Sequence, residues 1–474
     1  MPASPIPVRP GASGVPGTSA TFPGDACPGA LRLHAADDGF LARVRVPGGV
    51  LDVDRARALG DAARRLGDGA LHLTSRGNVQ LRGLRDGCGG ELAAVLGAAG
   101  LLPSAAHERV RNVVASPMSG LDGLGCVDVR AWLTGLDAAV LASSVTPELS
   151  GRFLFGLDDG RGDVAGLRPD VLLRGRADGS ALLVVGGAEF VVRYEDAARA
   201  AVIAAEVFVG AARVVSDRRV WRVSELGASG AELGAWIAER LSASGIEAGP
   251  ARGAGNCAPG HDASVRADET ATGADAKATG LRPGPRCLSY KGGTEFSGPS
   301  APTPGGAEFS GPSAPAPGGA GMYGPSASAG NPAGGGPALQ VIPRFGSLTG
   351  DQWTALTDLA AELPARELRL TPWRRVVVPG ATSRQAPAGL ITDPDSPWSR
   401  LGACIGRPGC AKSRTDVRAD ATAQYTPHPT LPTYWSGCER RCGHPVGPYV
   451  DVVARPDGTY DVTTLTTERA EPRV

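Results

Sequence analysis

The chain has 474 residues, enough for two or three domains, and 42% of them are hydrophobic, which is ordinary for a globular protein. Lys plus Arg and Asp plus Glu each number 48, so the charge balance gives no reason to expect nucleic acid as a partner. No run of about 18 apolar residues occurs, and no membrane span is therefore expected. Lysine is rare (Lys277, Lys291 and Lys412), and an arginine-rich chain suits fork-shaped recognition of carboxylates.

The first segment, residues 1–30, is rich in Pro and Gly and is predicted to be a disordered N-terminal extension. It lacks the apolar core of an export signal, so a cytoplasmic location is expected. Because that compartment is reducing, clustered cysteines in this chain favour metal binding over disulfide bonds.

An internal repeat follows. Residues 46–83 can be placed over 343–380 without gaps, at a constant offset of 297 residues. Each copy has an aspartate where a helix cap belongs, Asp54 or Asp351, and then apolar residues at helical spacing. Each copy continues with short strand-like runs, LHLTSRGNVQLRG or LRLTPWRRVVVPG. The repeat predicts a duplicated α+β unit.

The region between the two copies predicts further regular structure and then a linker. The patterns indicate strands at 154–157, 182–185 and 190–192 and helices at 197–209 and 230–242. Residues 254–337 consist largely of Gly, Pro, Ala and Ser and are predicted to be a disordered linker. Cys257 and Cys287 lie in this linker and are poor candidates for metal ligands.

Four cysteines near the C-terminus form two local pairs. Cys404 and Cys410 are separated by five residues, and Cys438 and Cys442 by three. Four thiolates on glycine-rich loops can hold a [4Fe–4S] cluster. Structural zinc normally uses pairs separated by about two to four residues, so the first pair fits zinc poorly. Two disulfides conflict with the expected compartment, and four unrelated buried cysteines are the remaining alternative.

These cysteines and three further stretches resemble the sulfite and nitrite reductase superfamily. The second pair lies within S-G-C-x-x-x-C-x-x-P, which resembles the cluster signature of those proteins. LTSRGNVQLRG at 73–83, VRNVVASP at 110–117 and LSGRFLFGLDDG at 149–160 resemble segments that line their tetrapyrrole. The resemblance implies a [4Fe–4S] cluster on Cys404, Cys410, Cys438 and Cys442, and tetrapyrrole contacts from Arg76, Asn78, Gln80, Arg82, Arg111 and Arg152.

The same resemblance implies the architecture. We expect an α+β fold of two pseudo-symmetric halves, each a ferredoxin-like unit plus a mixed sheet-and-helix domain of the sirohaem-reductase type, joined by the disordered linker. The predicted domains after the N-terminal extension are a first ferredoxin-like half-domain (31–102), a first tetrapyrrole-binding sheet domain (103–253), the linker (254–337), a second ferredoxin-like half-domain (338–384) and a cluster and tetrapyrrole-binding domain (385–474).

Two features distinguish among members of the superfamily. Arg152-Phe153-Leu154 stands where the reductases have K-F-K, and a leucine has no proton to donate. LRLTPWR at 368–374 is similar to a segment of the precorrin-3B synthase family. That similarity implies precorrin-3A as the substrate, a non-haem iron that activates O₂, and an external electron donor, either a reductase or ferredoxin. The expected reaction hydroxylates the macrocycle and closes a γ-lactone, before ring contraction in cobalamin biosynthesis.

Two other functions stay open. An assimilatory sulfite or nitrite reductase would hold sirohaem itself. A non-catalytic module that binds a cluster or zinc is the other alternative, because a fold alone does not determine a function. Such a module would have neither turnover nor a tetrapyrrole pocket.

Overall fold

The computed structural model describes residues 28–215, 220–250, 337–445 and 447–465. The predicted linker lies outside these residues except for Pro337, and so does most of the predicted N-terminal extension. Cys257 and Cys287 lie outside them too. Among the described residues, no helix is long and apolar enough to cross a membrane.

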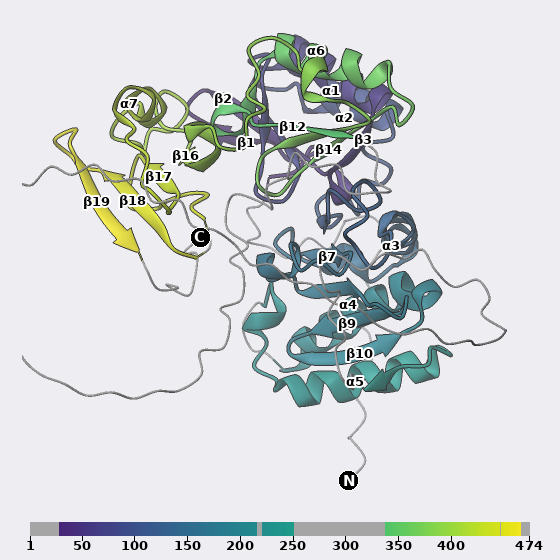
Figure 1. The fold of residues 1–474 in the computed structure, drawn as a ribbon. Coiled ribbons are helices and arrows are strands. Elements are labelled where there is room, and N and C mark those ends of the chain that lie inside the picture. Colours follow the sequence, from purple (N-terminus) through teal and green to yellow (C-terminus); the bar gives the residue numbers. More distant parts are fainter. Residues whose placement is uncertain (1–27, 216–219, 251–336, 446, 466–474) are drawn as a thin grey trace, which may run out of the picture. The chain divides into compact units, whose positions relative to one another are not determined.

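The predicted repeat is present as two ferredoxin-like units (Figure 1). The first contains β1 (His34–Ala36), β2 (Gly39–Val44), β3 (Val50–Asp52), α1 (Val53–Leu66), β4 (Leu71–Leu73), β5 (Val79–Leu84) and α2 (Gly89–Ala98). The second contains β12 (Ala338–Val341), β13 (Ser347–Leu348), α6 (Gly350–Ala361), β14 (Glu367–Leu370) and β15 (Val376–Pro379). The prediction of a duplicated α+β unit is confirmed.

The two units exchange their short edge strands. β3 of the first unit pairs with β14 of the second, and β13 of the second pairs with β4 of the first, both antiparallel. The resulting sheets have the orders β1-β2-β5-β4-β13 and β12-β15-β14-β3. Because each unit completes the sheet of the other, the two copies share one hydrophobic core.

Equivalent residues of the two copies have the same local conformation. Gly77 and its counterpart Arg374 both have a positive φ, +66° and +57°, and each amide donates to the carbonyl of the threonine three residues earlier. At the contact between α1 and α6, Trp353 Nε1 donates to the carbonyl of Ala56 at 2.8 Å. Trp353 is the repeat equivalent of Ala56, so the pseudo-twofold axis passes close to this pair.

The helix caps lie two residues before the predicted ones. The Asp52 carboxylate accepts a hydrogen bond from the amide of Arg55 at 2.8 Å, and the Thr349 hydroxyl accepts one from the amide of Gln352 at 3.2 Å. The prediction that Asp54 and Asp351 are caps was wrong, because β3 leads directly into α1 and β13 into α6 after a single residue. Both aspartates lie in the first helical turn, where a negative charge interacts favourably with the helix dipole.

A six-stranded sheet with order β11-β10-β9-β8-β7-β6 forms the next domain. Its strands are β6 (Val113–Ala115), β7 (Phe155–Asp158), β8 (Val171–Gly175), β9 (Ala181–Val185), β10 (Ala188–Val192) and β11 (Gly249–Pro250). Helices α3 (Arg130–Ala142), α4 (Ala197–Val215) and α5 (Gly230–Ala243) accompany it, and Figure 1 shows α4 and α5 beside β9 and β10. The predicted strands and helices of this region are confirmed, with α4 longer than expected.

The last domain is a four-stranded sheet with order β16-β17-β18-β19. Its strands are β16 (Leu401–Ala403), β17 (Thr433–Ser436), β18 (Tyr449–Ala454) and β19 (Tyr460–Leu465), and α7 (Val417–Gln424) packs against β16 and β17. The first three strands are parallel, so the loops after β16 and β17 leave the same edge of the sheet. Cys404 begins the first of these loops and Cys438 lies in the second.

The close approach of the two ferredoxin-like units requires glycine at position 49. Gly49 has φ +72°, and a Cβ atom there would lie 1.9 Å from the carbonyl oxygen of Leu370. Gly49→Ala is expected to lower the free energy of unfolding by about 2–3 kcal/mol in a urea titration. Gly97→Ala, on the open face of α2, is the control and should raise stability by about 0.5–1 kcal/mol. Equal effects of the two alanines would contradict this account of the interface.

Candidate functional site

The four cysteines lie on the two loops that follow β16 and β17. The amide of Cys404 donates to the carbonyl of Trp435 at 3.0 Å, which holds the start of one loop against the end of β17. The amide of Gly437 donates to Cys404 Sγ at 3.2 Å. All four thiols are free in the described structure, and Cys442 is the most exposed of them.

The thiols influence one another electrostatically. Burial raises the pKa of Cys442, and the neighbouring thiols of Cys404, Cys438 and Cys410 raise it further. Burial likewise raises the pKa of Cys404, although amide donors from Gly437 and Gly406 oppose this. Thiols with raised pKa values ionise when they bind a cationic centre, and amide donors to sulfur are a common feature of such centres.

Arginines from other parts of the chain hold the cysteine loops. Arg82 forms a bidentate ion pair with Asp38, at 2.8 Å for both bonds, and donates to the carbonyl of Gly409 at 2.8 Å. Arg374 Nη2 donates to the carbonyl of Gly443 at 3.2 Å. Arg418 Nε donates to the carbonyl of Cys404 at 3.1 Å, and burial lowers the pKa of Arg418 to about 10.

The predicted tetrapyrrole segments meet at one backbone carbonyl. Arg76 Nη1 donates to the oxygen of Gly151 at 3.1 Å, and Asn112 Nδ2 donates to the same oxygen at 2.6 Å. Asn78 Nδ2 donates to Asn112 Oδ1 at 3.1 Å. Residues of the 73–83, 110–117 and 149–160 segments, recognised separately in the sequence, therefore form one hydrogen-bonded network.

The other predicted arginines have different surroundings. Arg111 is 6% exposed, pairs with both oxygens of Asp137 at 2.7 Å, and donates to the carbonyl of Leu101. Arg82 forms its ion pair with Asp38 and its hydrogen bond with the Gly409 carbonyl, next to Cys410. Gln80 is half-buried on β5, opposite Arg43 of β2. Arg82 and Arg111 are buried with carboxylate partners, whereas Arg76 and Arg152 are half-buried.

The Arg152-Phe153-Leu154 segment presents no lysine. The Arg152 guanidinium lies over the Trp221 ring, 4.1 Å from its centroid. Phe153 is fully buried in the core, and Leu154 is buried in a small apolar cluster with Val164. Lys412, the one lysine within the described residues, is exposed on the Cys410 loop.

A cavity of about 620 Å³ adjoins the Cys404–Cys410 loop. Its wall includes Arg407, Arg418, Asp38 and Phe345, and none of the six predicted tetrapyrrole residues. Arg374 and Arg418 were not predicted as site residues. The LRLTPWR segment contained a signal for Arg374, but nothing in the sequence around Arg418 indicated a contact with the Cys404–Cys410 loop.

No ligand set for a non-haem iron of the two-histidine-one-carboxylate type can be assigned. Within the described residues, the only group of three or more His, Cys, Asp or Glu side chains with ligand atoms within 4.8 Å of one another is Asp158, Asp159 and Asp163.

Comparison with known proteins identifies the family. The Nitrite/Sulfite reductase ferredoxin-like half domain matches residues 33–98 and 331–389, which are the two repeat copies. The two repeat copies belong to this half-domain family, and the relatives described next support membership of the sulfite/nitrite reductase superfamily. A match of one domain type to both copies confirms that the halves are related by duplication.

Relatives in this superfamily include a ferredoxin–nitrite reductase of Synechococcus elongatus, 34% identical over 128 residues, covering 26% of this chain and 25% of that protein. A precorrin-3B synthase of Sinorhizobium sp is 32% identical over 148 residues, covering 31% of each. These alignments span less than a third of either relative's length. The structure of Mycobacterium tuberculosis NirA has the same fold, with a TM-score of 0.57 and 17% identity, covering 91% of this chain and 75% of that one.

Proposed function

We propose that this chain is an iron–sulfur oxidoreductase that acts on a tetrapyrrole substrate, in a reaction of the precorrin-3B synthase type. The observation that carries the proposal is the network at the Gly151 carbonyl, because it joins three tetrapyrrole segments next to a strand from which lysine is absent. The similarity to a precorrin-3B synthase supports the same function.

The cluster assignment rests on the donor set. Cys404, Cys410, Cys438 and Cys442 supply four thiols from two loops that leave one sheet edge, and amides of Gly437 and Gly406 are directed at one sulfur. A single zinc with Zn–S bonds of about 2.3 Å needs its sulfurs within about 4.6 Å of one another. The five-residue separation of Cys404 and Cys410 fits structural zinc poorly, which favours a [4Fe–4S] centre over a single zinc. A [4Fe–4S] cluster held there would supply single electrons.

The residues of the chain orient the substrate. Arg76 donates to the Gly151 carbonyl, Arg152 lies over Trp221, and both are half-buried, so each could turn a guanidinium edge to an acetate or propionate carboxylate of the substrate. Fixing several carboxylates fixes which carbon of the macrocycle is presented for reaction. In the proposed reaction one atom of O₂ enters the substrate as a hydroxyl group. The other leaves as water, with two electrons from the external donor and two protons, and a substrate carboxylate closes the lactone.

The proton requirement separates this function from sulfite or nitrite reduction. Reduction of an oxyanion by six electrons needs proton donors beside the bound anion. At the two positions that carry lysine in the reductases, Arg152 stacks on Trp221 and Leu154 is buried among apolar side chains. A sulfite or nitrite reductase remains the second candidate, because a nitrite reductase and a sulfite reductase component both match part of the chain.

One preparation distinguishes the two candidates. Anaerobically purified protein should contain about four irons or slightly more, about four labile sulfides and no extractable sirohaem. It should then convert precorrin-3A only when O₂ and an electron donor are present. Stoichiometric sirohaem would instead identify a sulfite or nitrite reductase, and absence of both iron and sulfide would contradict the cluster.

The contact from Arg82 to Gly409 gives a separate prediction. Arg82→Gln removes the ion pair with Asp38 and loosens the Cys410 loop, so iron release to a chelator should be about tenfold faster or more. The control is Arg57→Gln, which removes an exposed ion pair with Asp358 on the helices. Equal release rates from the two variants would show that Arg82 does not hold the cluster loop.

A further inference from the structure

The two sheet domains follow the same strand plan. β6, β7 and β8 are parallel neighbours, as are β16, β17 and β18, and each set is followed by an antiparallel strand. The registers place Ala115 opposite Leu157 in the first domain and Ala403 opposite Trp435 in the second. Ser116 therefore occupies the position of Cys404. The loop after β7 likewise occupies the position of the loop that carries Cys438 and Cys442.

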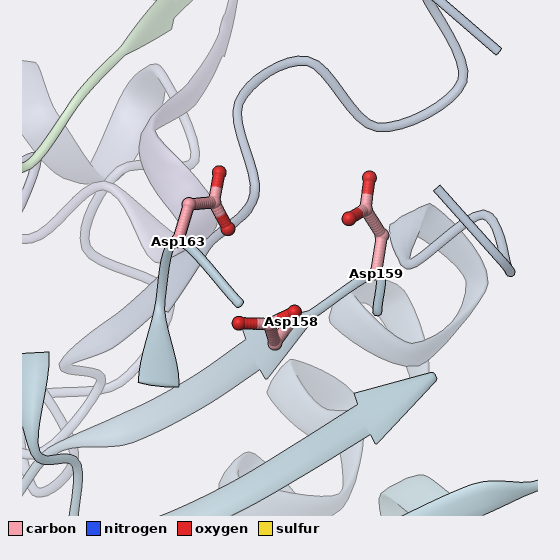
Figure 2. A group of neighbouring side chains, drawn as sticks. All are labelled: Asp158, Asp159 and Asp163. Atoms are coloured by element: carbon pink, nitrogen blue, oxygen red, sulfur yellow. The ribbon is translucent and has the colours of Figure 1, made fainter. Parts of the chain in front are cut away.

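The first domain has three aspartate carboxylates in this position. Asp158, Asp159 and Asp163 have carboxylate oxygens within 4.8 Å of one another. Figure 2 shows the three side chains facing a common space, with Asp158 at the end of its strand and the other two on the loop beyond it. Their exposed fractions are 0%, 0% and 7%. Three carboxylates are rarely buried together unless positive charge compensates them.

Asp163 lacks part of that compensation. Its Oδ1 accepts a hydrogen bond from the Ser116 hydroxyl at 2.6 Å, but its Oδ2 is buried without a hydrogen-bond partner. Burial, followed by the charge of Asp158, raises the pKa of Asp163 to about 7. A buried carboxylate oxygen without a partner is costly, and a bound cation would remove that cost.

The neighbouring groups form a frame around the three aspartates. Both oxygens of Asp158 accept backbone amides, from Gly160 and Gly162 on one side and from Val164 and Ala165 on the other, which folds the loop. Asp159 pairs with Arg161, which also pairs with Asp122. Arg161 thus bridges Asp159 and Asp122, and Arg174 of β8 lies opposite Asp158 in the strand register.

We propose that Asp163, together with Asp159 and Asp158, binds a hard divalent cation at the position in the first half that corresponds to the cysteine centre in the second. Carboxylate and hydroxyl oxygens suit Mg²⁺, Ca²⁺ or Mn²⁺, whereas the thiols of the second half suit softer iron. Duplication has on this view produced one oxygen site and one sulfur site on equivalent loops.

Titration of the full chain with Mn²⁺, followed by electron paramagnetic resonance of the free ion, tests the proposal. The parent protein should bind one Mn²⁺, displaceable by Mg²⁺ or Ca²⁺, and Asp163→Asn should bind it about tenfold more weakly or worse. Asp86→Asn, which changes an exposed aspartate, is the matched control and should bind like the parent.

The thermal midpoint provides a second readout. Mn²⁺ should raise the unfolding temperature of the parent and of Asp86→Asn, but not that of Asp163→Asn. If Asp163→Asn does not fold, the rise in the parent on adding Mn²⁺ and its loss on adding a chelator still test the site. No saturable Mn²⁺ binding by the parent, or equal binding by parent and Asp163→Asn, would overturn the proposal and leave Asp163 as a buried protonated acid.

Discussion

Replacing Cys438 with serine is expected to leave the purified protein with almost no iron and almost no labile sulfide, where the parent should have about four of each. Cys438 lies two residues beyond β17, on the loop held against Cys404 through the amide of Gly437. Serine oxygen is a harder ligand than a thiolate, and a hydroxyl loses its proton far less readily than a thiol, so the remaining three cysteines would hold an open and labile centre. Iron and sulfide assays with the visible absorption spectrum measure the loss.

The control for this variant is another cysteine of the same chain. Cys88 is buried at the N-terminal end of α2, and its side chain makes no capping hydrogen bond there. Cys88→Ser places a favourable capping residue at that position and should leave iron and sulfide unchanged. If Cys438→Ser kept its full iron and sulfide content, the proposed cluster ligands would be wrong.

The duplication could be predicted from sequence, but the exchange of strands could not. The L-x-L-T runs at 71–74 and 368–371 lie in strands and turns whose conformation is the same in both copies, so similar residues were retained there. β13 has only two residues and β3 three, too few for an alternating pattern to indicate a strand. Their partners are set by the packing of α1 against α6, which involves residues about 300 positions apart in the chain.

The candidate site likewise has features that could be predicted from sequence and features that could not. The cysteine pairs and the tetrapyrrole segments were predicted because their residues are close in sequence and their spacing carries chemical information. The partners of Arg82 and Arg111, Asp38 and Asp137, were not predicted, since an ion pair between distant residues leaves no local pattern. The proximity of Asp158, Asp159 and Asp163 could not be predicted for another reason. A run of acidic residues after a strand normally indicates a solvated loop, and burial is decided by tertiary packing.

Removal of the two half-buried arginines is the most direct test of the tetrapyrrole site. Arg152→Ala should weaken the binding of uroporphyrin, a tetrapyrrole with acetate and propionate carboxylates, by about 10–100-fold, because a charge-assisted bidentate bond contributes about 1.5–3 kcal/mol. Arg76→Ala should weaken it by a similar factor. Its network should survive, since Asn112 still donates to the Gly151 carbonyl. Quenching of the porphyrin fluorescence measures both dissociation constants.

The matched control is Arg85→Ala, which removes an exposed arginine of the first ferredoxin-like unit and should leave uroporphyrin affinity unchanged. Iron and sulfide contents should be equal in the parent and all three variants, so that a loss of affinity is not a loss of fold. Arg152→Lys separates charge from geometry. Lysine keeps the positive charge but cannot form a fork of parallel hydrogen bonds, so its affinity should fall between those of the parent and Arg152→Ala. Parent-like affinity in both Arg76→Ala and Arg152→Ala would mean that these arginines serve only the loop around Gly151, and that the tetrapyrrole is held elsewhere.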